Sequence, residues 1–256
     1  MKRASKVIAD KQQLAAIAKI LQNYLRLPFS QTNIPGAILE GILGHVRNAE
    51  VLRTYDFVDV IDRKQKLGWQ VKSTIESTPM TWKRAKIPTS IALITESRKS
   101  KDGLQALGDA IINFCNHHAA ESFRIYDLDE IAFSRLIVHK DGRGTYYEKS
   151  LCTRKMPNIF EPEDFTWTWS KQKVTKTKEQ LSALHGVHIP SGKKWFAWHG
   201  LGENQLHFSG EKYWWPSEDK RIKSITFKLP TEAERLSLEK FIDLLASADN
   251  PLQLKV

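Results

Sequence analysis

The chain has 256 residues, 41% hydrophobic and 27% charged, a composition typical of a folded globular protein rather than a disordered one. Lys and Arg outnumber Asp and Glu by 39 to 29, and the resulting net charge of +10 favours a polyanionic partner. No apolar run reaches the roughly 18 residues of a membrane span, and no signal-peptide core follows the charged N-terminus. Two cysteines exclude a disulfide framework. We therefore expect a cytoplasmic protein that does not associate with membranes.

Charged and aromatic residues are unevenly distributed along the chain. Most of the positive excess lies before residue 150, whereas six of the eight tryptophans follow it: Trp167, Trp169, Trp195, Trp198, Trp214 and Trp215. We expect at least four of these six to be structural, because most tryptophans belong to the core. The asymmetry suggests two functional regions within one protein.

The first 130 residues are predicted to mix helices with strands. Apolar residues at helical spacing indicate helices over 9–25, 34–52 and 102–119. Runs rich in β-branched and aromatic residues indicate strands over 55–62, 67–73, 90–95 and 123–127. Prolines make the segment 74–88 irregular. From the second helix onward, the order is helix, strand, strand, strand, helix, strand.

The rest of the chain is predicted to be mostly β. Short strands are indicated over 133–138, 144–148, 165–170, 194–199, 204–209 and 224–228. Helices are indicated near 177–185 and over 231–247. We therefore predict an α/β fold with a core over residues 1–130 and a β-rich, Trp-rich region over 131–256 that packs on it and ends in a helix.

Four polar residues in the first region form a pattern that carries chemistry. Asp59 lies near the end of one predicted strand, and Gln70 and Lys72 share one face of the next strand because strand side chains alternate. Glu40, on the preceding helix, is about 20 residues upstream. Carboxylate oxygens suit Mg²⁺, and a neighbouring lysine can orient or deprotonate a water. The pattern predicts metal-assisted phosphodiester hydrolysis.

These residues and the element order over roughly 34–127 resemble the PD-(D/E)XK nuclease superfamily, and within it the type II restriction endonucleases. The resemblance implies a restriction-endonuclease-like core with a mixed sheet. It assigns the first acidic position to Asp59, the second to Gln70 and the lysine to Lys72. Glu40 corresponds to the helical glutamate that some members use, and Asp59 and Glu40 are the implied Mg²⁺ ligands.

Two positions differ from the usual motif. Val58 precedes the acid where a proline is common, and Gln70 stands where a carboxylate is usual. A Q-x-K version resembles the modification-dependent restriction nucleases, in which Glu40 or Asp62 would supply the missing charge. Asp56 and Asp62 remain rivals to Asp59, because strand register is not determined by the sequence. The alternative without chemistry is an edge hairpin with solvated polar residues.

Several polar and basic residues are candidates for DNA contacts. The segment after Lys72 mixes hydroxyls with basic residues suited to phosphates, and its tryptophan offers a stacking surface. A hairpin turn and a basic pair in the second region offer further contacts. The candidates are Ser73, Thr81, Trp82, Lys83, Arg84, Lys86, Arg143, Lys193 and Lys194.

The histidines give no metal-binding motif. His185, His188, His199 and His207 are close enough in sequence to line a cleft, but no H-E-x-x-H or H-x-E pattern occurs, so we assign them structural or surface roles. The sequence also lacks G-x-x-x-x-G-K-[ST], so we expect no nucleotide cofactor.

Together these features predict a homodimeric type II restriction endonuclease that cleaves double-stranded DNA with Mg²⁺. The dimer is expected because palindromic sites are commonly bound by two-fold symmetric proteins. The alternatives are a modification-dependent or nonspecific DNA nuclease, or a non-catalytic nucleic-acid-binding protein with a nuclease-like core. A structural protein that binds another acidic partner is a further alternative. The recognition sequence and the cleavage position do not follow from the residues.

Overall fold

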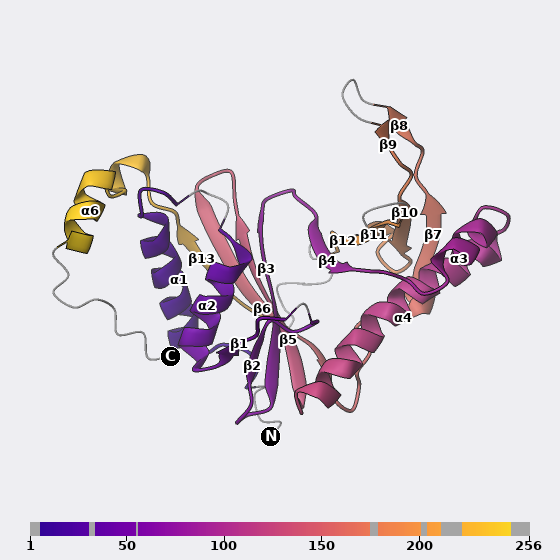
Figure 1. The fold of residues 1–256 in the computed structure, drawn as a ribbon, viewed down its shortest axis with the longest axis horizontal. Coiled ribbons are helices and arrows are strands. Elements are labelled where there is room, and N and C mark those ends of the chain that lie inside the picture. Colours follow the sequence, from indigo (N-terminus) through magenta and orange to yellow (C-terminus); the bar gives the residue numbers. More distant parts are fainter. Residues whose placement is uncertain are drawn as a thin grey trace.

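The computed structural model describes residues 6–30, 34–54, 56–174, 179–200, 204–210 and 222–246, without the side chains of 173–174, 179–180 and 222. The fold is mixed α/β, with two sheets that lie beside each other (Figure 1). The α/β class is therefore confirmed. Within the described residues, no helix is long and apolar enough to cross a membrane.

The first sheet is six-stranded and mixed. Its strands, in spatial order, are β1 (Glu50–Val51), β2 (Val60–Asp62), β3 (Leu67–Ile75), β5 (Glu130–Val138), β6 (Arg143–Thr153) and β13 (Ile222–Lys228). The first three strands pair antiparallel, β5 pairs parallel to β3, and β6 and β13 continue antiparallel. A parallel neighbour requires a crossover, and the helices between β3 and β5 provide it.

Two N-terminal helices cover one face of this sheet. α1 (Lys11–Leu25) begins at an Asp10 N-cap whose side chain accepts a hydrogen bond from Gln13 N, and α2 (Gly36–Arg47) follows it. Their apolar sides pack on residues such as Trp69 and Val71 of β3 in a largely aliphatic core. The opposite face of β3, which carries Gln70 and Lys72, therefore points away from α1 and α2.

The second sheet is five-stranded and antiparallel. Its strands, in spatial order, are β4 (Met80–Arg84), β12 (Gln205–Phe208), β11 (Lys193–His199), β10 (Leu184–His188) and β7 (Phe165–Trp169). A short ribbon of β8 (Lys173–Val174) and β9 (Glu179–Gln180) extends from it. Two 3₁₀ turns (Pro162–Asp164 and Glu232–Glu234) and the helix α6 (Leu238–Ala246) complete the elements.

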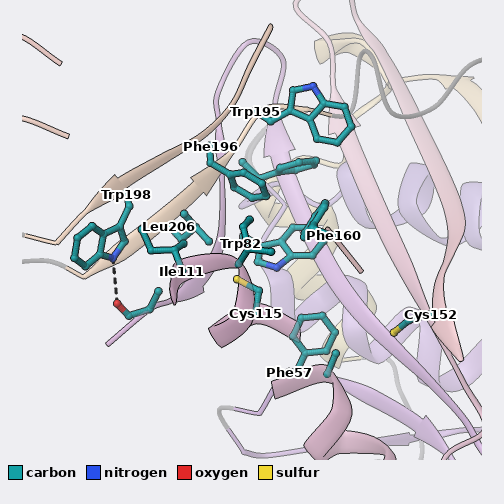
Figure 2. Packing of buried hydrophobic residues seen from close by; sticks show 14 of the residues in the cluster. Phe57, Trp82, Ile111, Cys115, Cys152, Phe160, Trp195, Phe196, Trp198 and Leu206 are labelled. Carbon is teal, nitrogen blue, oxygen red and sulfur yellow. Dashed lines mark hydrogen bonds between the residues drawn. The ribbon is translucent and has the colours of Figure 1, made fainter. Parts of the chain in front are cut away.

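An aromatic core joins the second sheet, the first sheet and the crossover helix. Figure 2 shows Trp82 of β4 among the rings of Phe57 and Phe160, with Phe196 and Cys115 nearby. Trp82 also stacks on Phe133 of β5, with ring centroids 5.4 Å apart. Offset ring pairs of this kind add about 0.5–1.5 kcal/mol beyond their buried area. The aromatic core thus fixes the strand β4 against the first sheet.

The longest crossover element is α4 (Lys101–Ile125), and a short helix, α3 (Ser90–Ser97), packs against it. The strand predicted over 90–95 is therefore wrong, because this segment is α3. A short apolar run does not distinguish a buried strand from a helix, and Ile91 is in fact 81% exposed. The strand predicted over 123–127 is also wrong. α4 continues to Ile125, and the chain leaves it at Asp127, which has a positive φ of 52°.

Other predictions differ in extent. The strand predicted over 55–62 is reduced to β2. α2 ends at Arg47, with its C-cap Asn48 in a left-handed conformation, rather than at residue 52. The segment 74–88, predicted to be irregular, contains β4. Where 177–185 was predicted to be helical, the described part holds β9 and the start of β10, and residues 175–178 lie outside the described residues.

The predicted boundary at residue 130 falls between two paired strands. β3 precedes it and β5 follows it, yet they are neighbours in one sheet, and β4 of the first region belongs to the second sheet. The two regions of the sequence therefore exchange strands, and each sheet is built from both.

Candidate functional site

The candidate site lies just before the first residue of β2, beside the part of β3 that β2 does not pair with. Asp59 precedes β2, and its backbone N–H donates to Trp69 O at 2.8 Å, so it is held in register with β3. Its carboxylate accepts a hydrogen bond from the Val71 N–H at 2.6 Å. Because β2 is short and β3 is long, this carboxylate occupies the open edge of β3. Burial raises the pKa of Asp59, and the neighbouring positive charge of Lys72 opposes that rise.

Lys72 lies next to this carboxylate. Its Nζ is 4.0 Å from Asp59 Oδ2, and both side chains are about one-fifth to one-quarter exposed. Solvent can therefore reach the pair, while the surrounding protein restricts it. An ammonium held at this distance from a carboxylate can position a water or bind an anionic group.

Gln70 is two residues earlier on the same face and is only 2% exposed. Its Nε2 donates to the Trp82 backbone oxygen at 3.3 Å. Its Oε1 is buried and accepts no hydrogen bond within the described residues. A buried acceptor without a donor is costly, so this oxygen is suited to a donor or a cation that enters the site.

Glu40 of α2 also acts on this place electrostatically. Burial raises the pKa of Glu40, the Asp59 carboxylate raises it further, and Lys72 lowers it. The side chain folds back along the helix, because a Cβ added at Gly36 would lie 3.4 Å from Glu40 Oε1. The pKa values of Glu40 and Asp59 are both raised, so a cation bound nearby would stabilise the charged form of each carboxylate.

Lys83 reaches the site from the second sheet by means of a β-bulge. Between β4 and β12, Thr81 pairs with His207 and Lys83 pairs with Leu206, so two residues of β4 span one step of the partner strand. The bulge places both Trp82 and Lys83 on the inner side, as bulges near active sites often re-aim a side chain. Burial lowers the pKa of Lys83; Asp56, Cys115 and Asp59 oppose that effect, and Lys72 adds to it.

Lys72 of the first sheet and Lys83 of the second sheet both interact with the charge of Asp59. Each lysine lowers the pKa of Asp59, and Asp59 raises the pKa of Lys83. The sequence placed Lys83 in an irregular basic loop, and its inward direction depends on the bulge. The structure therefore places Asp59, Gln70 and Lys72 at one edge of the first sheet, with Glu40 of α2 and Lys83 of β4 within electrostatic range of Asp59.

A divalent cation fits this set of donors. Asp59 and Glu40 supply hard carboxylate oxygens, and Gln70 Oε1 is a buried oxygen that lacks a donor. Within the described residues, no group of three or more His, Cys, Asp or Glu side chains forms a metal cluster. A cation here would therefore depend on two carboxylates, the amide and water, as Mg²⁺ commonly does.

The two rival aspartates accept hydrogen bonds from other residues, although the charge of Asp56 also acts on Lys83. Asp56 accepts a hydrogen bond from the Tyr126 hydroxyl, and this bond lowers the pKa of Asp56. Asp62 accepts hydrogen bonds from Gln65 N and Nε2, both at 2.9 Å, and so closes the β2–β3 turn. Of the three, only Asp59 forms an ion pair with Lys72 in the described residues.

Arg135 is a neighbouring basic residue that the sequence reading missed. It pairs in register with Lys72 across β3 and β5, so both side chains lie on the same face. It is 3% exposed, and its Nη2 donates to Thr74 Oγ1 at 2.9 Å. Had 130–138 been predicted as the strand beside β3, the alternation of its side chains would have placed Arg135 on the face of Lys72. The strand after the long helix was instead predicted at 123–127.

The predicted DNA-contacting residues are scattered. Trp82 is buried in the aromatic core, so it offers no stacking surface, and Ser73 points to the face opposite Lys72. The exposed candidates are Thr81 and Arg84 on β4, Lys86 after it, and Lys193 and Lys194 on β11. Arg143 is exposed on the β5–β6 turn, where it forms an ion pair with Asp141 at 2.7 Å.

Most of the described tryptophans of the second region are core residues. Trp167, Trp195 and Trp198 are buried, and Trp198 Nε1 donates to Ala85 O at 3.1 Å, as Figure 2 shows. Trp169 is half-buried, with its Nε1 3.0 Å from Ser97 Oγ. Trp214 and Trp215 lie outside the described residues.

Comparison of the chain with protein-family models, with curated proteins and with solved structures finds no match.

Proposed function

We propose that this protein is a Mg²⁺-dependent endonuclease of double-stranded DNA, a type II restriction endonuclease with a PD-(D/E)XK-like core. The observation that carries the proposal is the ion pair between Asp59, just before β2, and Lys72 on β3, with Nζ and Oδ2 4.0 Å apart. Glu40 of α2 and Lys83 of β4 interact electrostatically with the same carboxylate. Acidic and basic groups gathered around one partly buried place suit the hydrolysis of an anionic phosphodiester.

The topology supports the same conclusion. α2 leads into the antiparallel strands β1, β2 and β3; β4 and α3 follow, and α4 then crosses over to β5, which is parallel to β3. Apart from β4 and α3, this is the helix, strand, strand, strand, helix, strand order of the PD-(D/E)XK core. Topology alone is a weak indicator of activity, because one fold hosts many functions. The proposal therefore depends on the side chains of Asp59, Gln70 and Lys72, and the topology is additional support.

The chain's own residues have distinct tasks in this proposal. Asp59 and Glu40 would hold Mg²⁺, and Gln70 Oε1 would face it or its waters. When bound, Mg²⁺ supplies Lewis-acid stabilisation of the phosphate charge. Lys72, as the ammonium paired with Asp59, orients the attacking water, and the proton of that water passes to solvent as the bond to phosphorus forms. Lys83 holds a positive charge opposite Lys72, where it stabilises negative charge as the new P–O bond forms and the P–O bond to the leaving oxygen breaks.

A second candidate function is DNA binding without cleavage, and Gln70 favours it. A neutral amide is a weaker metal ligand than a carboxylate, and its Nε2 is already engaged by Trp82 O. The carboxylates would then serve only to keep the site polar. A nonspecific nuclease and a nuclease that requires modified bases share the Asp59 site with the main proposal, and they differ from it only in the DNA that they cleave.

The deciding experiment is incubation of the full chain with plasmid and phage DNA, methylated and unmethylated, with Mg²⁺ or with EDTA. Discrete Mg²⁺-dependent fragments are expected. Smearing would indicate a nonspecific nuclease, cleavage of methylated DNA alone would indicate modification dependence, and a gel shift without cleavage would support the binding protein. Lys72→Ala should reduce cleavage at least about 1,000-fold while retaining the gel shift. Lys19→Ala, at an exposed position on α1, is the matched control and should cleave normally.

Metal binding can be measured apart from cleavage. Mg²⁺ that binds only the folded protein should raise its melting temperature. The shift should be lost in Asp59→Asn and Glu40→Gln if these carboxylates hold the ion. The proposed homodimer has its own readout, the sedimentation mass of the chain with and without DNA. A monomer in both states would remove the dimer from the proposal.

A further inference from the structure

The second sheet has an outer face that points away from the aromatic core. Strand pairing places one row of residues across β4, β12, β11, β10 and β7: Thr81, His207, Ala197, His185 and Thr168. The residues that precede or follow these on their strands, such as Phe196 and Phe208, are buried on the inner face. Because strand side chains alternate, the row faces outward.

A hollow of about 280 Å³ lies on this outer face. Ala197 occupies the middle of the row, and its small side chain leaves space between His185 and His207. His199, two residues further along β11, lines the same hollow, and its ring centroid is 4.9 Å from that of His207. The hollow therefore has an alanine floor and walls made partly of imidazole rings.

Basic and hydroxyl groups also line the hollow, beside the apolar Pro79, Leu181 and Ala183. Lys171 and Lys194 are exposed there, and Ser170 and Ser209 are half-buried. Ser170 Oγ accepts a hydrogen bond from the Ala183 N–H at 2.9 Å, so its position is fixed by the backbone. No Asp or Glu lines the hollow among the residues that the structure describes. The fixed charge of the described lining is therefore positive, which suits an anionic ligand.

We propose that this hollow binds one nucleotide unit, with the base over Ala197 between the imidazole rings and the phosphate at the two lysines. Bases stack on aromatic side chains, histidine included, and ammonium groups bind phosphate oxygens. The volume lies near the lower limit of small-molecule sites, roughly 300 Å³, which suits one nucleotide and excludes a dinucleotide cofactor. The nucleotide is either a free mononucleotide or an unpaired nucleotide of a strand, since both present the same chemistry.

This site is separate from the one around Asp59. Lys83 of β4 points to the inner side, whereas Thr81 of the same strand points outward with His207. The inference therefore stands without the proposed cleavage, and it gives a task to histidines that carry no metal-binding motif.

The test is isothermal titration calorimetry of the full chain in EDTA. The probes are the four 5′-deoxynucleoside monophosphates, an eight-nucleotide single-stranded DNA and inorganic phosphate. Ala197→Leu fills the floor of the hollow, and Thr168→Leu places the same side chain in the same row but outside the lining. We expect Ala197→Leu to weaken nucleotide binding at least about tenfold and Thr168→Leu to leave it unchanged. His207→Ala, which removes one ring and adds no bulk, should weaken it as well.

The outcomes separate the possibilities. The probe that binds more tightly, mononucleotide or oligonucleotide, identifies the source of the nucleotide. The proposal is overturned if no probe binds, if Ala197→Leu and His207→Ala bind as the wild type does, or if phosphate binds as tightly as the nucleotides. Lys72→Ala should bind normally. A failed cleavage assay with intact nucleotide binding would therefore reject the nuclease proposal and leave this one standing.

Discussion

The two sheets bury different kinds of side chain and leave different kinds exposed. Helices α1 and α2 pack on the first sheet through a largely aliphatic core, whereas the buried face of the second sheet carries mostly aromatic side chains. The charged groups of the candidate site lie where these two arrangements meet, with Asp59 and Lys72 on one side and Lys83 on the other. Burial raises the pKa of Glu40 on α2 and lowers the pKa of Lys83 on β4.

The comparison shows that the site depends on both sheets for different reasons. The first sheet holds Asp59 beside Lys72 through the hydrogen bonds between Asp59 and β3, and α2 on its other face carries Glu40. The second sheet supplies Lys83 through the β-bulge, and it supplies the buried Trp82, which packs next to Gln70. A variant that affects only the aliphatic core should therefore change stability without changing chemistry, and a variant at the junction should change both.

The largest expected effect is on the carboxylate next to Lys72. Asp59→Asn should lower the cleavage rate at least about 1,000-fold, because it removes a metal ligand and the partner of Lys72. Asp56→Asn, at the rival position bound by Tyr126, should cleave within about threefold of the wild type. Single-turnover cleavage of plasmid DNA measures both variants. The opposite ranking would place the site at Asp56.

The next largest effect is expected from emptying the aromatic core rather than the aliphatic core. Trp82→Ala should lower the free energy of unfolding by about 3–5 kcal/mol, because it empties the aromatic core. It should also reduce cleavage, because a shift of β4 would move the Trp82 carbonyl that binds Gln70 Nε2 and the adjacent Lys83. Leu21→Ala, under the other face of the first sheet, should cost about 2–5 kcal/mol but leave cleavage by the folded protein unchanged. Urea denaturation gives the stabilities. Equal effects on cleavage would contradict the distinction between the cores.

A smaller effect is expected from the lysine of the second sheet. Lys83→Met should lower the cleavage rate constant about 10- to 100-fold, with little change in DNA affinity, because the charge acts on the reacting phosphate. Lys83→Arg should restore part of the rate. Lys19→Met, which removes an exposed charge on α1, should match the wild type. Normal cleavage by Lys83→Met would show that the second sheet contributes no charge to the reaction.

The smallest effect is on stability as a function of pH. Burial raises the pKa of Asp59 above its ordinary value of 3.8, with Lys72 opposing in part. The folded protein thus binds this proton more tightly than the unfolded chain does. The stability contributed by the group is fully present below its unfolded pKa and is lost as the pH rises through its folded pKa.

Asp59→Asn removes this titration. It should therefore be more stable than the wild type at pH 7, and the difference should shrink towards about pH 4. Denaturation curves of both proteins at the two pH values measure it. A variant that is less stable at pH 7 would indicate that the Val71 N–H bond to Asp59 matters more than burial.

The helices α1 and α4 and the strand β3 were predictable because each carries a long periodic pattern. The same holds for the pairing of Asp59 with Lys72, since a hairpin brings residues of neighbouring strands together. The segment 90–95 was not predictable, because six apolar residues suit a buried strand and a packed helix equally. The predicted strands 90–95 and 123–127 are helical or follow a helix, and the first sheet contains β1 and β5 in addition to the predicted neighbours β2 and β3.

The sequence alone determined the residue types and spacing of the site: one acid before a strand, an amide and a lysine on one face of the next, and a glutamate on the preceding helix. Local spacing fixes such relations, because alternation and short hairpins act within a few residues. Only the tertiary structure decided that Lys83 points inward, that Trp82 is core, and that Arg135 joins the face of Lys72. These facts depend on strands paired across long separations, where partner choice follows from the packing of the whole core rather than from any local pattern.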